Sequence, residues 1–387
     1  MITKRLLDVC DFQGGTQPPK EEWINDPREG YVRMLQIRDY SQGDAKFIQY
    51  VKDTKKLHKC KKDDIMLSRY GYIGQAFMGL EGAYNVALVK VIKKEEIHTP
   101  YLLYYFQSYY FQHFLLSNVG ARATIPGFNK DELENALIRL PEKREQVEIA
   151  SKIAKVDELI GYHKQQLDIL DALIKSRFIE MFGTISSNEQ NFEILTIESL
   201  CSLIKDGTHQ TPTYTEDTLN GFKFLSSKDV MTEKIDWSNI KYIPSALHEK
   251  LYAVVKPIRN DILMSKNGVN YGVAAVNDTD EVFDIYVSLA LLRPKTDIIN
   301  PVYFRCAINN PDTKRQFDGS IKGIGVPNLH LGEIKKTQIL VPPMDKQIEY
   351  VSFVEHIDKS KFYIIQTQKI IELLIRAIQY TTKEVLL

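Results

Sequence analysis

Two stretches of the chain carry mostly apolar residues at alternating spacings of four and three, and these are the longest regular patterns in the sequence. We call these positions the seam residues. The first runs through Ile149, Ile153, Val156, Ile160, His163, Leu167, Leu170 and Ile174. The second runs through Tyr350, Val354, Ile357, Lys361, Ile364, Gln368, Ile371 and Ile375. A seven-residue repeat of this kind is typical of helices that pack along a narrow seam. We therefore predict two long helices, over residues 141–183 and 342–387, each with the other as its nearest candidate partner.

The two helical stretches are copies of each other. A shift of 201 residues superimposes residues 141–183 on the second copy without a gap. Under this shift the chain repeats Pro141, Gln146, Glu148, Ser151, Asp157, Tyr162, Gln165, Leu173 and Ile174. A fixed long period indicates two copies of one larger unit. At ~1.5 Å per residue, each helix predicts a rod of roughly 55–60 Å.

An alternative reading treats the helices as ordinary amphipathic helices, each packed on its own domain. The polar seam positions His163, Lys361 and Gln368 fit that reading, or a seam with one specific register.

The regions that precede the helices, residues 1–140 and 184–341, repeat one order of short strands and turns. In the first region we predict strands over 32–37, 65–68, 86–91 and 136–140, and a helix that Pro100 opens. The second region matches this order with a glycine loop at 207–212, with 225–229 and 261–268, and with Pro301 and Pro327 in the places of Pro100 and Pro126. The shift grows from about 191 to 201 and then stays constant. A fixed scaffold with variable surfaces is the simplest account.

Composition narrows the class of protein. A chain of 387 residues is long enough for two or three domains. Its four cysteines are far apart and form no CxxC pair, which predicts free thiols in a reducing, cytoplasmic compartment and no zinc ribbon. The start of the chain does not resemble a signal peptide, and no run of ~20 apolar residues predicts a membrane span. The net charge is zero, so a nucleic-acid surface would have to be local or shared with a partner.

The doubled arrangement resembles the specificity subunit of type I restriction–modification systems, the HsdS family. Its most specific part is the sequence that enters each helix, IRLPEKREQ at 138–146 and ILVPPMDKQ at 339–347. A hydrophobic–proline turn precedes each copy, Ile125-Pro126 and Val326-Pro327. The resemblance covers essentially the whole chain.

The resemblance implies an α+β fold with two similar target-recognition domains, of mixed β-structure with short helices. The domains would span 1–140 and 184–341. The two long helices, 141–183 and 342–387, would separate them as an antiparallel coiled coil. Each domain would read one half of a bipartite site in double-stranded DNA. The subunit would be non-catalytic, and would hold two DNA methyltransferase subunits and, in the restriction-competent complex, restriction/translocase subunits.

Candidate DNA-contacting residues lie in loops rich in glycine and polar side chains, because glycine lets a backbone approach a phosphate and Arg, Lys, Asn and Gln read base edges. In the first region they are Thr16, Gln17, Arg69, Tyr70, Tyr72, Arg122 and Thr124. In the second they are Thr208, His209, Gln210, Lys266, Asn267, Asn270, Tyr271 and Lys322. The alternatives are hairpin turns, flexible connections and a solvated loop histidine. The lysine-rich stretch 52–62 is a further candidate for phosphate contact, or a solvated face.

Enzyme readings are weaker. The sequence has no amino-methyltransferase motif, no glycine fingerprint for a cofactor and no GxxxxGK[ST] phosphate loop. A nuclease-like pattern over 311–335 does not recur in the first copy, and the histidines form no ligand cluster. We therefore expect no catalytic residues, no metal and no cofactor. The competing hypothesis is a coiled-coil scaffold or adaptor that binds other proteins without reading DNA.

Overall fold

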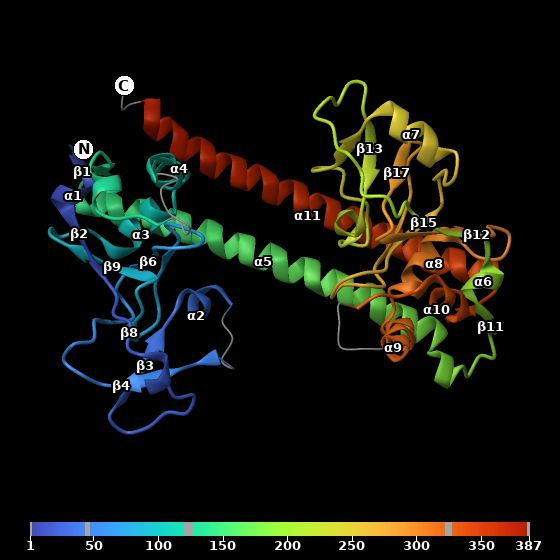
Figure 1. The fold of residues 1–387 in the computed structure, drawn as a ribbon, viewed down its shortest axis with the longest axis horizontal. Helices are drawn as coiled ribbons and strands as arrows, with labels where there is room; N and C mark the ends of the chain where they lie inside the picture. Colours follow the sequence, from blue (N-terminus) through green and yellow to red (C-terminus); the bar gives the residue numbers. More distant parts are fainter. Residues whose placement is uncertain (1, 43–46, 120–126, 322–326, 385–387) are drawn as a thin grey trace. The chain divides into compact units, whose positions relative to one another are not determined.

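The computed structural model describes residues 2–42, 47–119, 127–321 and 327–384, the last nine of these for their backbone only. It divides into two compact units (Figure 1). Unit 1 comprises residues 1–164 with 365–387, and unit 2 comprises residues 165–364. Each long helix therefore contributes one half to each unit.

The described residues of unit 1 form three small sheets, and short helices connect their strands. Its strands are β1 (Ile2–Arg5), β2 (Cys10–Gly14), β3 (Tyr31–Leu35), β4 (Tyr50–Lys52), β5 (Lys59–Cys60), β6 (Met66–Ser68), β7 (Ala76–Phe77), β8 (Gly82–Tyr84), β9 (Leu88–Lys93) and β10 (Leu137–Leu140). Its shorter helices are α1 (Leu6–Val9), α2 (Ile37–Ser41), α3 (Thr99–Gln107) and α4 (Tyr109–Asn118), with 3-10 turns at Lys20–Glu22 and Asp131–Leu133. The sheets have the orders β1-β10, β2-β9-β6-β7 and β4-β3-β8-β5.

Unit 2 repeats this plan. Its strands are β11 (Glu193–Thr196), β12 (Cys201–Asp206), β13 (Phe222–Leu225), β14 (Lys241–Ile243), β15 (Ile262–Ser265), β16 (Ala274–Val276), β17 (Phe283–Ile285), β18 (Leu289–Pro294) and β19 (Gln338–Val341). Its shorter helices are α6 (Ile197–Leu200), α7 (Ser245–Tyr252), α8 (Pro301–Ile308), α9 (Pro311–Ser320) and α10 (Leu331–Lys336), with 3-10 turns at Ile185–Ser187 and Ser227–Val230. The sheet orders are β11-β19, β12-β18-β15-β16 and β14-β13-β17.

The strand pairings confirm the internal repeat predicted from the sequence. The central strand β3 runs parallel to β8 and antiparallel to β4, and β13 runs parallel to β17 and antiparallel to β14. The predicted strand over 32–37 ends two residues earlier than expected. The Asp39 carboxylate accepts from Gln36 N (2.8 Å), and this capping box starts α2 and ends β3 at Leu35.

The two long helices are α5 (Lys143–Phe182) and α11 (Met344–Glu384). Every seam residue predicted for them is buried or half-buried. Inside unit 2 the helices are in contact. Tyr350 donates a hydrogen bond to Ile174 O (3.0 Å), and Lys361 forms an ion pair with Asp171. Tyr350 contacts Ile174, and Lys361, later in α11, contacts Asp171, which is earlier in α5; these two segments therefore run antiparallel. The polar seam residue Lys361 thus has a carboxylate partner.

The core of unit 2 is built on these helix segments. Phe178 and Phe182 of α5 pack on Tyr350 of α11, with ring centroids 5.5 Å apart in both pairs. Tyr303 of α8 joins the same cluster. The core of unit 1 lies instead between the sheet β2-β9-β6-β7 and the helices α3 and α4, around Phe106 and Phe111.

A buried glutamine fixes each long helix to its own globular domain. Gln146 donates from Nε2 to Pro141 O (2.9 Å), and its Oε1 accepts from His98 N (2.9 Å), just before α3. Gln347 donates to Pro342 O (2.8 Å) and accepts from Asn300 N (2.8 Å), just before α8. Both side chains are at most 5% exposed.

A tyrosine adds a second matched tie. Tyr101 donates to Arg139 O (2.7 Å) and Tyr303 donates to Leu340 O (2.9 Å). Tyr101 and Tyr303 are 202 residues apart, whereas the strand residues that they contact, Arg139 and Leu340, are 201 residues apart. The prediction that Pro301 occupies the place of Pro100 is therefore wrong by one residue, because Pro301 corresponds to Thr99. Pro100 is the second residue of α3, whereas Pro301 is the first residue of α8.

We predict that Gln347→Ala lowers the free energy of unfolding of unit 2 by about 1–3 kcal/mol, because it leaves buried backbone groups without partners. The chain has two tryptophans, so in a Trp23→Phe background Trp237 reports urea unfolding of unit 2. The exposed Gln165→Ala on α5 is the matched control, with an expected change under about 0.5 kcal/mol. Equal effects of the two substitutions would contradict the role of the buried amide.

Candidate nucleic-acid interface

In unit 1, two predicted loops meet at one end of the sheet β2-β9-β6-β7. Gly15 N donates to Leu88 O (3.1 Å) and Thr16 N donates to Tyr84 O (3.0 Å), which ties the glycine loop to the segment before β9. Arg69 N donates to Ala87 O in the same segment (2.8 Å). The structure thus brings Thr16 and Arg69 to one edge. We call residues 14–17, 69–72, 85–87 and 127–129 the loop edge of unit 1.

Unit 2 has the same edge, formed by residues 206–210, 266–271, 286–288 and 327–329. Gly207 N donates to Leu289 O (3.2 Å), and Lys266 N donates to Ser288 O (2.9 Å). Asn267 forms a β-bridge with Asn328, as Tyr70 does with Gly127 in unit 1. The loops that correspond in the two halves of the sequence therefore occupy corresponding positions in their own units.

The glycine of each edge is required by close backbone packing. A Cβ on Gly15 would lie 2.0 Å from Asn85 O, and one on Gly207 would lie 2.3 Å from Ile285 O. Real Cβ atoms do not approach an oxygen this closely, so only glycine allows the loop to cross the neighbouring strand end.

The cation of unit 1 stands at the surface of its edge. Arg69 donates from Nε to Phe128 O (3.1 Å) and from Nη2 to the side chain of Asn129. Its guanidinium also lies 5.3 Å from the ring centroid of Tyr70. Tyr72, at the tip of the same loop, is 80% exposed. This loop presents an oriented cation and an aromatic ring to solvent.

The matched cation of unit 2 is instead buried. Lys266 is 5% exposed and forms an ion pair with Asp206. Asp206 pairs with Ala290 in its sheet, and the corresponding position of unit 1 is Gly14, which pairs with Val89. Unit 1 has glycine in place of a carboxylate at this position, and Arg69 is half-buried and donates to Phe128 O and Asn129 instead.

Tyr271 is also directed into unit 2. It is 9% exposed, and its hydroxyl donates to the carboxylate of Asp318. Lys314 Nζ lies 3.3 Å from the centroid of its ring. Hydrogen bonds from Lys314 and then Tyr271 lower the pKa of Asp318, which keeps this carboxylate ionised. Tyr271 and Lys266 thus stabilise the loop edge of unit 2 through buried contacts with Asp318 and Asp206.

The remaining predicted residues of the edges are more exposed. Gln17, Gln210 and Asn270 are exposed, and Thr208 is half-buried. His209 is exposed, and its Nε2 lies 3.7 Å from Asp206. Asn267 donates to the side chain of Asn328 (3.2 Å). The predicted residues Arg122, Thr124 and Lys322 lie outside the described residues.

Sequence reasoning missed several residues that complete the edges. His58 N donates to Thr16 Oγ1 (3.4 Å), and its Nδ1 lies 2.6 Å from Gly14 O, so the lysine-rich stretch, near its middle, touches the glycine loop. In unit 2, Ser227 N donates to Ser288 Oγ (3.0 Å). The matched segments 35–39 and 225–229 were visible in the sequence, but their position beside the loops was not.

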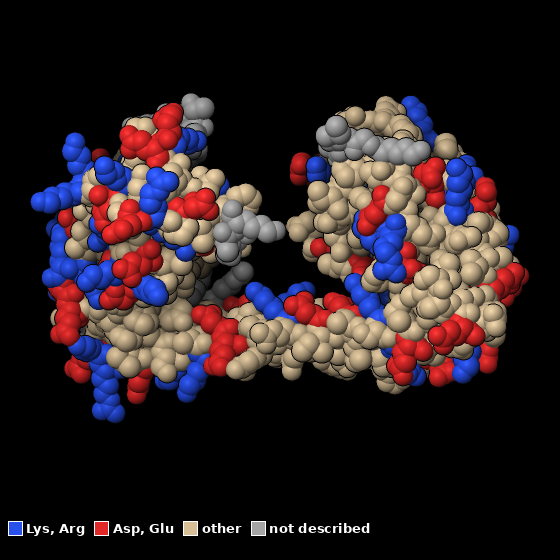
Figure 2. All heavy atoms as spheres, turned by 90° about the horizontal axis from the view of Figure 1, so that it is seen from below, with Lys and Arg blue, Asp and Glu red and all other residues tan. Residues whose placement is uncertain are grey.

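Charge is not segregated on these units. Figure 2 shows basic and acidic side chains interspersed over the face it draws of each unit. This agrees with the near-balance of Lys and Arg against Asp and Glu in the sequence. A contact with a polyanion would therefore depend on local groups such as Arg69.

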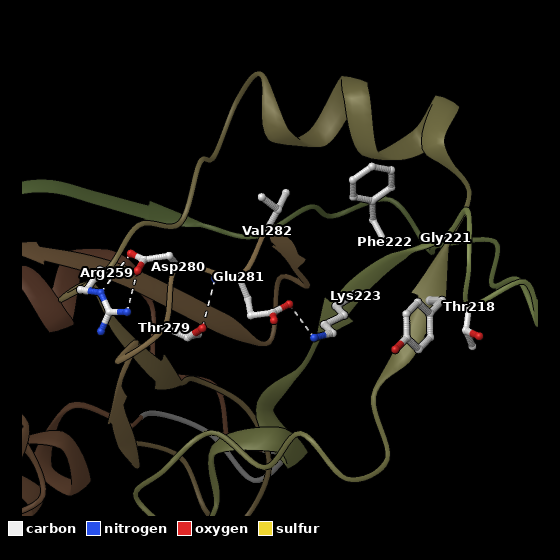
Figure 3. A pocket seen from close by; sticks show the side chains of 10 residues that line it. Thr218, Gly221, Phe222, Lys223, Arg259, Thr279, Asp280, Glu281 and Val282 are labelled. Atoms are coloured by element: carbon white, nitrogen blue, oxygen red, sulfur yellow. Dashed lines mark hydrogen bonds and ion pairs between the residues drawn. The ribbon is translucent and has the colours of Figure 1, made fainter.

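A cleft of about 690 Å³ in unit 2 lies at the other end of β13 (Figure 3). Its two basic side chains are neutralised by carboxylates. Lys223 pairs with Glu281 (2.6 Å), and Arg259 pairs with Asp280 (2.7 Å). Because β13 starts in this cleft and ends at the loop edge, the cleft is separate from the candidate interface.

Within the described ranges, no group of three His, Cys, Asp or Glu side chains is placed to hold a metal ion. None of the helices described there is both long and apolar enough to cross a membrane. The four cysteines are buried free thiols. Burial raises the pKa of Cys10 and of its counterpart Cys201 to about 12, so both remain protonated and unreactive at neutral pH.

Comparison with known proteins places these features in one family. The family model for the type I restriction modification DNA specificity domain matches residues 1–171 and again residues 189–374. The chain is 23% identical over 371 residues to the type I restriction enzyme MjaVIII specificity subunit of Methanocaldococcus jannaschii, with 92% of this chain and 85% of the relative covered. It is 21% identical over 366 residues to the EcoBI specificity subunit of Escherichia coli, covering 87% and 75%.

A solved structure shares the fold. A chain from a structural study of complex assembly and conformational transition of the type I R-M system superimposes with a TM-score of 0.58 at 15% identity, covering 98% of this chain and 96% of that chain.

Proposed function

The chain belongs to the family of type I restriction–modification DNA specificity proteins, and from this premise we propose that it reads a bipartite DNA site, one half with each unit. It is a specificity subunit and not itself an enzyme. The observation that carries the proposal is the duplicated loop edge. Two equivalent edges on one scaffold suit two short sequences, and their linkage multiplies the discrimination that each achieves alone.

The chemistry of the edges supports contact with DNA. Arg69 offers a planar fork of donors, which suits phosphate or guanine. Thr16, Thr208 and Gln210 offer hydroxyl, amide and backbone donors of the kind that contact phosphates. Because net charge is zero, we expect the binding strength to come from few contacts and from partner subunits.

The long helices carry matched exposed apolar residues that we assign to docking of two methyltransferase subunits. The pairs are related by the 201-residue shift and are Val147 with Ile348, Tyr162 with Tyr363, Ile169 with Ile370, and Leu173 with Leu374. All eight side chains are between 42% and 70% exposed. Exposed apolar clusters of this kind mark protein-binding surfaces.

Each unit holds one member of every matched pair, and we call these four exposed apolar residues the docking set of that unit. Unit 1 holds Val147, Tyr162, Ile370 and Leu374, and unit 2 holds the matched residues Ile348, Tyr363, Ile169 and Leu173. Two equal sets suit two copies of one partner. In the restriction-competent complex we expect restriction/translocase subunits to join this assembly.

We predict that Ile169→Asp or Ile370→Asp each removes one methyltransferase subunit from the complex, and that the double substitution removes both. A charge on an exposed apolar contact opposes its burial in an interface. Native mass spectrometry of the reconstituted complex measures the stoichiometry. Lys164→Asp, about 140° around α5 from Ile169, is the control and should retain two subunits. Loss of both subunits from either single variant would contradict two separate sets.

We further predict that helix length sets the gap between the half-sites. Removal of residues 160–166 and 361–367 deletes one heptad from each helix and preserves the seam phase. It shortens each rod by about 10 Å, which corresponds to about three base pairs. Sequencing of methylated sites should show a gap shorter by about that amount with both half-sites unchanged. An unchanged gap in a folded, active double deletion would show that the helices do not set the spacing.

A further inference from the structure

In unit 1, the segment after β3 carries a guanidinium that neutral groups hold in place. Arg38 donates from Nη2 to Gln49 Oε1 (2.8 Å) and to Phe47 O (3.2 Å), and it lies 5.4 Å from the centroid of the Phe47 ring. Gln49 is itself positioned. Gln36 donates to the same Oε1 (3.2 Å), and Gln49 Nε2 donates to Asn25 Oδ1 (3.4 Å).

The charge of Arg38 is not neutralised by a described residue. Its neighbour Arg33 pairs with Asp39 (2.7 Å), and the buried Lys266 of unit 2 pairs with Asp206. No carboxylate of the described residues lies within ion-pair distance of Arg38, and its Nε is shielded from solvent without a hydrogen-bond partner. An oriented cation whose acceptors among the described residues are all neutral suits an acceptor from another molecule.

Arg38 belongs to a continuation of the loop edge. Leu35 O, at the end of β3, accepts from Asn85 N (3.0 Å). The carbonyl oxygen of Asn85 is the atom that a Cβ on Gly15 would meet most closely. The segment from Gln36 to Arg38 thus follows directly on the strand end that borders the glycine loop.

Unit 2 has different chemistry at the same place. Arg33 pairs with Tyr50 in unit 1, and Lys223 pairs with Tyr242 in unit 2, which puts Lys241 in the position of Gln49. Lys228, in the position of Arg38, is exposed and lies 3.8 Å from Asp229. The scaffold is shared while the polar network is present in one unit only, as expected where two domains read different sequences.

We propose that Arg38 contacts a guanine edge in the half-site read by unit 1, and that Gln49 is its positioning residue. Guanine presents two acceptors, O6 and N7, in the major groove. Because Nη2 of Arg38 already donates to Gln49 and Phe47 and its Nε is shielded from solvent, the two N–H bonds of Nη1 are the donors that face them. Unit 2 reads its half-site without this contact. The inference rests on the proposed function, because it assigns one base-reading residue to one of the two edges.

The test uses the complete complex with its methyltransferase subunits and a library in which each half-site position is varied. Arg38→Lys keeps the charge but removes the planar group in which Gln49 holds Nη2 and thereby fixes the position of Nη1. We expect it to reduce the preference for a G·C pair at one position of one half-site by about 5- to 150-fold, with the other half-site unchanged. Gln49→Ala should weaken the same preference more mildly.

Arg28→Ala is the matched control. Arg28 lies three residues before β3, whereas Arg38 lies three residues after it, and it stacks on Tyr31 with 5.7 Å to the ring centroid. We expect it to retain the full site preference. Trp23 packs on the cluster of Met34 and Val51, so its fluorescence in a Trp237→Phe background verifies that the region around β3 is folded in each variant.

Two results would overturn the inference. Folded Arg38→Lys with the wild-type preference at every position would exclude a base contact. A loss of affinity that is uniform over all sequences would identify a phosphate contact instead. Either result leaves the proposed function intact if the wild-type complex still selects a bipartite site, whereas a wild-type complex without such selection would refute the proposed function itself.

Discussion

A buried amide at the start of each long helix is the contact on which the arrangement depends. Gln146 and Gln347 join the first turn of a helix to the segment that precedes another helix of the same globular domain. A buried amide that loses a partner costs about 1–3 kcal/mol, so each helix resists a change of direction against its own domain. The same junction occurs twice. Under the proposed function, such rigidity is what allows helix length to be converted into a distance along DNA.

The two units preserve this scaffold and differ in the polar groups at its edge. Gly15 and Gly207 are both required by a carbonyl that lies too close for a Cβ. By contrast, Arg69 is half-buried and donates to a backbone oxygen, while Lys266 is buried against Asp206. Packing and backbone pairing therefore restrict the scaffold, whereas exposed side chains can change without loss of the fold. Under the proposed function, this separation would let one half-site change independently of the other.

The sequence predicted what depends on local periodicity and on the repeat. The seam positions of both helices, the repeated order of short elements and the glycine loops follow from spacing, and the structure confirms them. The burial of Lys266 could not be predicted, because Asp206 is sixty residues away and is brought near by pairing through β18. The Arg38 network has the same origin, since Gln49 precedes β4, which pairs with β3. Non-local strand pairing decides which polar side chains meet.

The most direct test of the account replaces residues 1–140 with the corresponding region of a relative that recognises a different site. Methylated sites are then sequenced in cells that carry the complete system. If each unit reads its own half-site, one half of the methylated sequence changes, and the other half and the gap remain as in the wild type. A folded, active chimera in which both halves change, or neither half changes, would contradict independent reading by the two units.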